Sequence, residues 1–174
     1  MIDGKLVRIR TVKEADVDEL YSLSCDYQDA GEYMPLSLVS ESAFKAEHRQ
    51  TGFWQDHCGK LLVEDLSGRM VGEAGFFKTA HYLDGREVYY RIFSGYRGQG
   101  YASDTLALLV QLFFESTSFN RLQAVTIEGN QASEHILKKS GFVLEGTVRQ
   151  ARYFKGRIVD LNLFSLLRGE YQES

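Results

Sequence analysis

The sequence predicts a mixed α/β (α+β) fold in which a central, largely antiparallel sheet carries helices on both faces. The 174 residues suit one domain, so we expect a single domain over residues 1–174. Hydrophobic residues make up 44% and charged residues 25%, as in ordinary globular domains. Strand and helix patterns alternate along the chain, and strands dominate its middle.

Charge and cysteine content exclude several classes of protein. The net charge of −4 argues against a general nucleic-acid binder and is compatible with a cationic substrate. Cys25 and Cys58 lack the partners of a zinc site or a disulfide framework, so reduced thiols are expected. The sequence begins without a secretory signal and has no run of roughly 18 apolar residues. We therefore expect a soluble cytoplasmic protein that binds no membrane, nucleic acid or metal.

The N-terminal part predicts one strand and one helix. Residues Lys5–Arg10 alternate as a strand does. Thr11 and Glu14 match the capping box T-x-x-E, which predicts a helix over Val12–Cys25.

The next segment changes from irregular chain to a hairpin. Residues 26–39 are irregular, and a helix is expected over residues 40–57. Gly59–Asp65 and Arg69–Lys78 are typical of strands, joined by a turn at Ser67-Gly68.

A third central strand and a long helix flank a glycine-rich segment. The strand is expected over Glu87–Phe93, after a turn at Asp84-Gly85. Gly95–Gly100 is rich in glycine, and an amphipathic helix runs from there to about Glu115. Its apolar face holds Ala102, Leu106, Leu109, Val110 and Phe113.

The C-terminal part predicts a strand, a helix and an antiparallel pair. The strand is Arg121–Ile127, and the helix Asn130–Lys139 ends before Gly141. The pair comprises Phe142–Arg149 and Ile158–Leu166, connected through Lys155-Gly156.

The segment Arg97–Ala102 lies between a strand and a helix and has the chemistry of an anion site. Successive backbone N–H groups and the positive end of the helix attract an anion, and glycine at 98 and 100 lets it approach the backbone. A tight connection is the alternative. The segment lacks the Lys-Ser/Thr of a P-loop and the G-x-G-x-x-G of a dinucleotide fold.

These residues resemble motif A (R/Q-x-x-G-x-G/A) of the GNAT superfamily of N-acetyltransferases. The similarity is dense from Glu87 to Arg168, whereas the N-terminal half matches only in the order of its elements. Two further stretches are similar to the RimJ/RimL-like branch, whose members acetylate ribosomal-protein N-termini or small amines. They are Asn130-Gln131-Ala132-Ser133 with Leu137, Lys138 and Ser140-Gly141-Phe142, and Glu145–Arg149 with Gly156–Asp160.

The resemblance implies acetyl-CoA as acyl donor, bound where the third central strand splays from the next. The pantetheine arm would lie in that gap beside Ile92, Phe93 and Ser94. The pyrophosphate would lie on the amides of Arg97, Gly98, Gln99, Gly100, Tyr101 and Ala102.

Three further residues of the expected site follow from the resemblance. Asn130 would bond the pantetheine, Ser133 would protonate the leaving thiolate, and Lys138 would belong to the cofactor site. Each has a structural alternative: Asn130 is a good N-cap and Ser133 can bond a helix carbonyl. The Arg97 side chain can likewise be a solvated arginine.

Two carboxylates are candidates for the base that deprotonates the amine. Glu87 is the first choice, because many relatives carry glutamate at the start of this strand; an ion-paired surface residue is the alternative. Glu73, between Gly72 and Ala74, is the second, since a buried carboxylate would suit general-base chemistry.

The acceptor stays open among three amines: a protein N-terminal α-amine, a polyamine, or an aminated metabolite or antibiotic. Deprotonation at pH 7 costs about 1 kcal/mol for an α-amine and more than about 4 kcal/mol for a lysine-like amine. Acidic residues in the segment 26–58 slightly favour a cationic acceptor; they are Asp26, Asp29, Glu32, Glu41 and Glu47. A non-catalytic acyl-CoA sensor and a Rossmann-type nucleotide binder are the other classes considered.

Other features carry weaker expectations. The four histidines show no metal spacing; they are His48, His57, His81 and His135. The basic run 149–157 is expected to be a solvated hairpin tip, with RNA contact as the alternative. A homodimer is possible by analogy with relatives.

Overall fold

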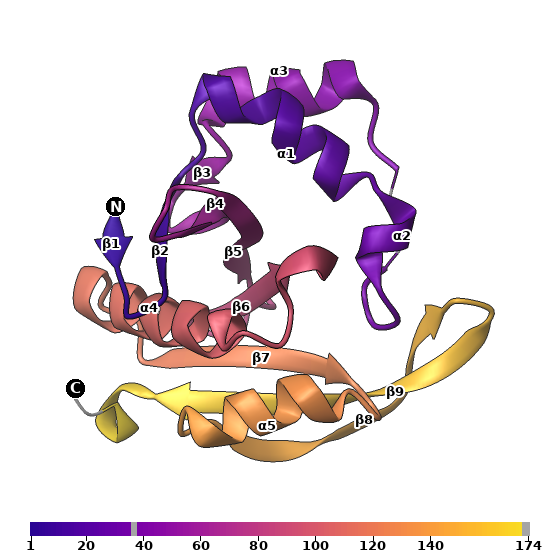
Figure 1. Ribbon diagram of the computed structural model, residues 1–174. Coiled ribbons are helices and arrows are strands. Elements are labelled where there is room, and N and C mark those ends of the chain that lie inside the picture. The colour runs from indigo at the N-terminus through magenta and orange to yellow at the C-terminus, as the bar shows by residue number, and fades with distance from the viewer. Residues whose placement is uncertain (36–37, 172–174) are drawn as a thin grey trace. The chain divides into compact units, whose positions relative to one another are not determined.

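The computed structural model describes residues 1–35 and 38–171 (Figure 1). The helices are η1 (Glu14–Asp16), α1 (Val17–Ser24), α2 (Tyr27–Ala30), α3 (Glu41–Thr51), η2 (Ser94–Tyr96), α4 (Tyr101–Ser116), α5 (Gln131–Lys139) and η3 (Arg168–Glu170). The strands are β1 (Ile2–Asp3), β2 (Val7–Thr11), β3 (Trp54–Gln55), β4 (Cys58–Asp65), β5 (Met70–Lys78), β6 (Gly85–Ile92), β7 (Arg121–Ile127), β8 (Val143–Phe154) and β9 (Arg157–Leu167).

The strands pair in the order β1-β2-β4-β5-β6-β7-β9-β8, and β3 pairs with β4. β6 and β7 are parallel, whereas β1–β2, β2–β4, β7–β9 and β8–β9 are antiparallel. The predicted mixed fold with a largely antiparallel sheet is therefore confirmed.

The chain forms two compact units. The first comprises Met1–Gly75 and Tyr90–Leu108, and the second comprises Phe76–Tyr89 and Leu109–Ser174. Strands β5 and β6 and helix α4 each run from one unit into the other. The expectation of a single domain over residues 1–174 stays a prediction.

The first unit has its own apolar core beneath α1 and α3, which pack together. Leu20 and Leu62 are fully buried there, and the Phe44 and Phe53 rings lie 4.7 Å apart. Leu20 on α1, Phe44 on α3 and Leu62 on β4 thus meet at positions that helical spacing and strand alternation select, and Phe53 joins them from the turn before β3. Val12, Val17, Met70 and Phe93 complete this core.

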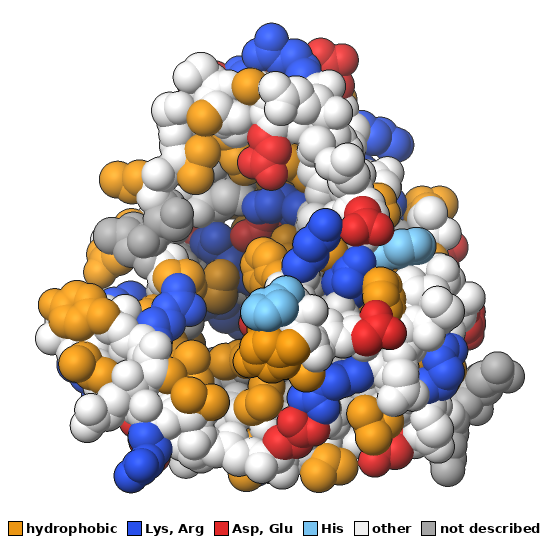
Figure 2. All heavy atoms as spheres, turned by 180° about the vertical axis from the view of Figure 1, so that it is seen from behind, with side chains coloured by type: hydrophobic (Ala, Val, Ile, Leu, Met, Phe, Trp, Pro, Cys, Tyr) orange, Lys and Arg blue, Asp and Glu red, His pale blue; other side chains and the backbone are white. Residues whose placement is uncertain are grey.

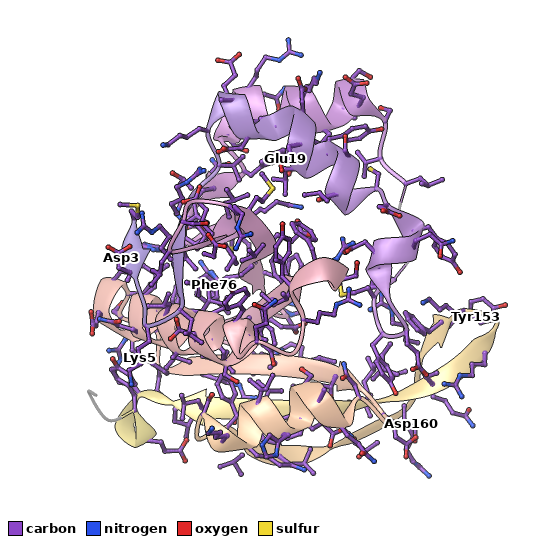
Figure 3. The ribbon with its side chains drawn as sticks, viewed as in Figure 1. Asp3, Lys5, Glu19, Phe76, Tyr153 and Asp160 are labelled. Atoms are coloured by element: carbon purple, nitrogen blue, oxygen red, sulfur yellow. The ribbon has the colours of Figure 1, made fainter. Side chains whose placement is uncertain are left out.

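The second unit is built on β7, β9 and β8, with α5 packed against β7 and β8 (Figure 1). Phe76 is buried in this unit, and its ring lies 5.7 Å from that of Phe113 (Figure 3). β8 and β9 form a long hairpin that carries Tyr153 near its tip (Figures 1 and 3).

The predicted capping box at Thr11 is wrong. Thr11 is the last residue of β2. The capping contact is made by Asp16, whose carboxylate accepts a hydrogen bond from the backbone N–H of Lys13 at 2.7 Å. Arg10 holds the same carboxylate through two hydrogen bonds of 2.6 and 3.0 Å. This ion pair fixes the chain up to Asp16, so η1 comes first and α1 starts at Val17.

The second helix ends earlier than predicted. Gly52 adopts φ 61° and donates its N–H to the His48 carbonyl at 2.7 Å, which terminates α3. Phe53 also has positive φ and leads into the short strand β3. Asp56 and His57, again with positive φ, form the turn from β3 into β4. A glycine stop signal at Gly52 was present in the sequence.

Gly85 has a different role from the one predicted. The turn lies at residues 81–82, and Gly85 is already the first residue of β6, paired with Arg121. A Cβ at Gly85 would lie 2.3 Å from the Arg121 carbonyl oxygen. Glycine is therefore required by the close approach of β7.

The final hairpin turns at Lys155-Gly156 as predicted, with φ 44° and 88°. Its first strand continues to Phe154, five residues further than expected from Phe142–Arg149. A bulge between Val148 and Arg152, with Gln150 at φ 50°, lets the strand resume pairing after the irregular stretch.

Further findings concern charges, thiols and membrane spans. Acidic and basic side chains lie next to one another over much of the face in Figure 2. Neither Cys25 nor Cys58 forms a disulfide. None of the helices in residues 1–35 and 38–171 is long and apolar enough to cross a membrane.

We predict an acid-sensitive contribution to stability from Glu145. Two hydrogen bonds from Arg121 (2.5 and 2.7 Å) and one from Ser165 lower the pKa of this carboxyl to about 2. A carboxyl in an unfolded chain titrates near about 4.3. Because the folded-state pKa is the lower one, the stabilisation is present above about pH 4.3 and is lost as the pH falls towards 2.

Urea unfolding between pH 2 and 7 tests this. The loss of unfolding free energy below about pH 4.3 should be smaller in Glu145→Gln than in the parent. Glu14→Gln, an exposed carboxylate, controls for removal of a charge. Identical pH slopes for the parent and Glu145→Gln would contradict the assignment.

Candidate functional site

The glycine-rich loop follows β6 and the single turn η2, and leads into α4. Gly98 and Gly100 have φ 78° and 82°, a left-handed conformation that glycine adopts without strain. Residues 97–100 are exposed, and a Cβ at Gly98 would meet no atom within 4 Å. The first N–H groups of a helix have no partner within the helix, so the start of α4 attracts an anion to this loop.

Asp104 anchors the start of α4, a role that the sequence analysis missed. Its carboxylate accepts hydrogen bonds from the backbone N–H groups of Leu6 (2.7 Å) and Val7 (3.0 Å). The Leu6 side chain lies against Gly100, where a Cβ would be 3.2 Å from it. The beginning of β2 therefore holds the C-terminal end of the loop.

Asp29 holds the other end of the loop. Its carboxylate is buried (5% exposed), accepts a hydrogen bond from Arg91 at 2.8 Å and accepts another from the Ser94 N–H. Burial opposes ionisation, but the bonds from Ser94 and Arg91 outweigh it and lower the pKa of Asp29. Asp29 was expected to line an acceptor pocket; here it is an internal counter-ion.

The side chain of Arg97 also bonds within the chain. Its Nε donates to the Ile92 carbonyl at 2.9 Å, and its Nη2 donates to the Asp29 carbonyl at 2.5 Å. The N–H groups of Phe93 and Ser94 are bonded to Val71 and Asp29. Several groups that were assigned to the cofactor thus already have protein partners, and their cofactor contacts stay predictions.

Glu73 is buried between two cations. It is 5% exposed, forms an ion pair with Lys60, lies 3.5 Å from Arg91 and accepts from the Ser24 hydroxyl at 3.3 Å. A Cβ at neighbouring Gly72 would lie 2.3 Å from the Arg91 carbonyl oxygen, so glycine permits the close approach. Glu73 is thus part of a charge network in the first unit.

Glu87 is half-buried and lies in the second unit. Its Oε2 accepts a hydrogen bond of 2.9 Å from the side-chain amide of Gln123. Glu87 and Gln123 are also register partners, the last of the three parallel pairs of β6 and β7. The partner of Glu87 is therefore a neutral amide, which the sequence analysis did not identify.

Asn130, Ser133 and Lys138 all belong to α5 or its cap. The side chain of Asn130 accepts a hydrogen bond from the Ser133 N–H at 3.3 Å, so Asn130 is the N-cap of α5. Lys138 lies 3.5 Å from Glu134 and 5.8 Å from the centre of the Phe164 ring.

The predicted residues therefore divide between the units. Ile92–Ala102 and Glu73 belong to the first, whereas Glu87, Asn130, Ser133 and Lys138 belong to the second. His48, by contrast, contacts the Val12 carbonyl at 3.1 Å in the core of the first unit. Within the described residues, no cluster of three or more His, Cys, Asp or Glu side chains could hold a metal ion.

A family model described as "Acetyltransferase (GNAT) domain" matches residues 7–143, so fold and sequence together define an acetyltransferase domain. The chain belongs to the GNAT family of acetyltransferases. The GNAT domain and the names of the relatives support the predicted enzyme class, an acetyl-CoA-dependent N-acetyltransferase.

Relatives are found among curated bacterial proteins. An uncharacterized N-acetyltransferase of Bacillus subtilis is 31% identical over 99 residues, 57% of this chain and 56% of that protein. Another from Bacillus licheniformis is 31% identical over 111 residues, 64% and 62% of the two chains. These matches span less than two thirds of the relatives. The ribosomal-protein-serine acetyltransferase of Escherichia coli is 22% identical over 163 residues, 91% of each chain, which gives distant support to RimJ-like relatives.

Solved structures share the fold. A GNAT-family acetyltransferase from Bacillus anthracis superimposes with a TM-score of 0.81 at 18% identity, covering 97% of this chain and 99% of that one. A spermidine N-acetyltransferase from Vibrio cholerae, solved with CoA and spermine, gives 0.83 at 16% identity, covering 94% and 96%. At these identities the likeness concerns the fold alone.

We predict that Asp29→Ala destabilises the protein by about 3–5 kcal/mol, because it removes the nearer of the two carboxylates paired with the buried Arg91 guanidinium and leaves only Glu73 at 3.5 Å. Asp26→Ala is the matched control: it removes only the N-cap of α2 and should cost about 1 kcal/mol. Urea unfolding of both variants measures the difference. Equal losses would show that the Asp29–Arg91 pair is not a main stabilising contact.

Proposed function

We propose that this chain transfers an acetyl group from acetyl-CoA to a primary amine by direct attack in a ternary complex. The observation that carries the proposal is the exposed loop before α4, with Gly98 and Gly100 at positive φ in a GNAT-family chain. Acetyl-CoA supplies the reactive thioester. The chain supplies binding, orientation and proton transfer.

The loop binds the pyrophosphate through the backbone N–H groups of Arg97–Ala102. Open space at the Cβ position of Gly98 lets an anion approach the backbone. The Arg97 guanidinium is bonded to Ile92 and Asp29, and its N–H donates to the Ser94 carbonyl at 3.5 Å, so the N–H groups that follow Arg97 carry most of the proposed contact. Asn130 and Lys138 remain proposed contacts to the donor.

Proton transfer is assigned to two side chains. Glu87 accepts a proton from the amine as the nitrogen bonds the acetyl carbon, and Ser133 gives a proton to the sulfur as the carbon–sulfur bond breaks. A backbone N–H of β6 polarises the thioester carbonyl. Direct attack needs neither Cys25 nor Cys58 as nucleophile.

An α-amine, on a protein N-terminus or a small molecule, is the acceptor best supported. It costs about 3 kcal/mol less to deprotonate at pH 7 than a lysine-like amine, by the difference in their ordinary pKa values. Three acids that favoured a cationic acceptor have internal roles: Asp26 caps α2, Asp29 pairs with Arg91 and Glu41 pairs with Lys45. The E. coli relative is named for acetylating a ribosomal protein.

A polyamine is the second candidate, because a fold neighbour was solved with spermine. An aminated antibiotic or metabolite and a non-catalytic acyl-CoA sensor remain alternatives. Homodimer formation and a cytoplasmic location are further expectations.

Thiol release from acetyl-CoA tests the function. Purified protein is assayed with short peptides carrying free N-termini, spermidine, lysine-like amines and aminated antibiotics. We expect the highest rate on peptides, and a loss of about 10²–10⁴-fold in Glu87→Gln with acetyl-CoA binding kept. Glu115→Gln, exposed on α4, is the control. Binding without turnover would favour the sensor, and absence of acetyl-CoA binding would refute the proposal.

The loop has its own test. Gly98→Ala should weaken acetyl-CoA binding about tenfold or more, because its Cβ occupies space that the anion needs. Gly68→Ala is matched, since Gly68 also has positive φ (86°) and open space at its Cβ but lies in the β4–β5 turn. Each should cost about 1–2 kcal/mol of stability. Calorimetric titration with acetyl-CoA should separate them; equal affinities would exclude the loop as the pyrophosphate site.

A further inference from the structure

We propose that Gln123 is a positioning residue for Glu87: its side-chain amide orients the carboxylate and keeps it ready to accept the proton of the amine. The inference rests on the proposed function and names a residue that acts through the base without touching substrate.

The geometry brings the two side chains to one face of the sheet. Glu87 and Gln123 are register partners in parallel strands, and paired residues project to the same face. The Gln123 Nε2 donates to Glu87 Oε2 at 2.9 Å. The helix α5 packs on the opposite face, where Lys138 lies over Phe164, a residue paired with Ala124.

The burial of Gln123 makes this contact unusual. Gln123 is 7% exposed, and its Oε1 is buried with no hydrogen-bond partner among the described residues. Its other strand partner, Ser165, donates its hydroxyl to Glu145. Turning the amide round would place its oxygen against the Glu87 carboxylate, so the orientation with nitrogen towards Glu87 is the favourable one.

Folding stability gives no reason for a glutamine here. A buried amide with one unpaired oxygen carries a desolvation penalty, and an apolar side chain of the same length would avoid it. The hydrogen bond to Glu87 is the one that the Gln123 side chain forms within the described residues. We therefore assign the glutamine to the orientation of Glu87.

The chemistry suits a base. A hydrogen bond donated to a carboxylate favours its ionised form, which is the form that accepts a proton. The donor is neutral, so it adds no charge that would hold the carboxylate in a permanent ion pair. On the strands next to Glu87, the charged or titratable side chains of the same alternation include Tyr89 on β6 and Arg121 on β7, and Arg121 is bonded to Glu145 of β8.

The test uses Gln123→Met, which removes the donor and keeps the length of the side chain. With the amine of highest rate in the panel, we expect kcat/KM to fall about tenfold. The loss should fall on kcat for that amine, whereas the KM for acetyl-CoA should stay unchanged, because only the orientation of the base is altered. Urea unfolding should show no loss of stability. Gln111→Met is the matched control, since Gln111 donates the same kind of bond to Glu115 (3.2 Å) on the exposed surface of α4.

A double-mutant cycle separates this role from a structural one. In the Glu87→Gln background, Gln123→Met should have no further effect. If Glu87→Gln lowers kcat but Gln123→Met leaves kcat unchanged, the positioning role is wrong and the proposed function stands. If Gln123→Met slows the enzyme equally in both backgrounds, its effect is structural and the inference is overturned. If Glu87→Gln retains the full rate, Glu87 is not the base, and both assignments fail.

Discussion

The buried ion pair between Asp29 and Arg91 is the contact on which the glycine-rich loop before α4 depends. Burying two charges is favourable only when their remaining hydrogen-bonding groups are satisfied. The Asp29 carboxylate also accepts the N–H of Ser94, 65 residues away, and the Arg91 Nη2 also donates to the Leu23 carbonyl, which leaves the Arg91 Nε as the buried donor without a partner among the described residues. The turn that leads into the glycine loop is therefore fixed by a side chain from a different part of the first unit. The conformation of the loop follows from this pair as much as from its glycines.

The loop is held at its two ends and exposed in between. Asp29 fixes the Ser94 end, and Asp104 fixes the start of α4 by accepting the N–H groups of Leu6 and Val7. The N–H groups that these carboxylates accept lie outside the 97–100 segment, which is held in addition by the Arg97 bond to the Asp29 carbonyl and by Leu6 against Gly100. A binding loop that is ordered before its ligand arrives loses less conformational entropy on binding, and donors already in position act as a preorganised site. The glycines allow the conformation of the loop, and the carboxylates of Asp29 and Asp104 hold the loop in that conformation.

Local patterns predicted the elements whose causes are local. The alternation of Arg121–Ile127, the N-cap Asn130 and the turn at Lys155-Gly156 appear where the sequence placed them. The failures at the candidate site are long-range. Asp29 was interpreted as a pocket acid because its partner is 62 residues away, and nothing near it in the sequence identifies that partner. Gln123 was missed for the same reason, because the hydrogen-bond partner of a polar residue in a buried strand lies on the neighbouring strand and cannot be identified from the local sequence. The roles assigned to site residues by family resemblance remain predictions.

Glu73 and Glu87 are two carboxylates with very different surroundings, which bears on the roles proposed for them. Protonating Glu73 would leave Lys60 and Arg91 facing each other without their common counter-charge, inside a low-dielectric core where that repulsion is strong. Glu73 is therefore suited to holding the sheet together. Protonating Glu87 leaves behind only a neutral amide. Proton uptake at Glu87 thus breaks no ion pair, and a group that must gain and lose a proton in every catalytic cycle is better placed there.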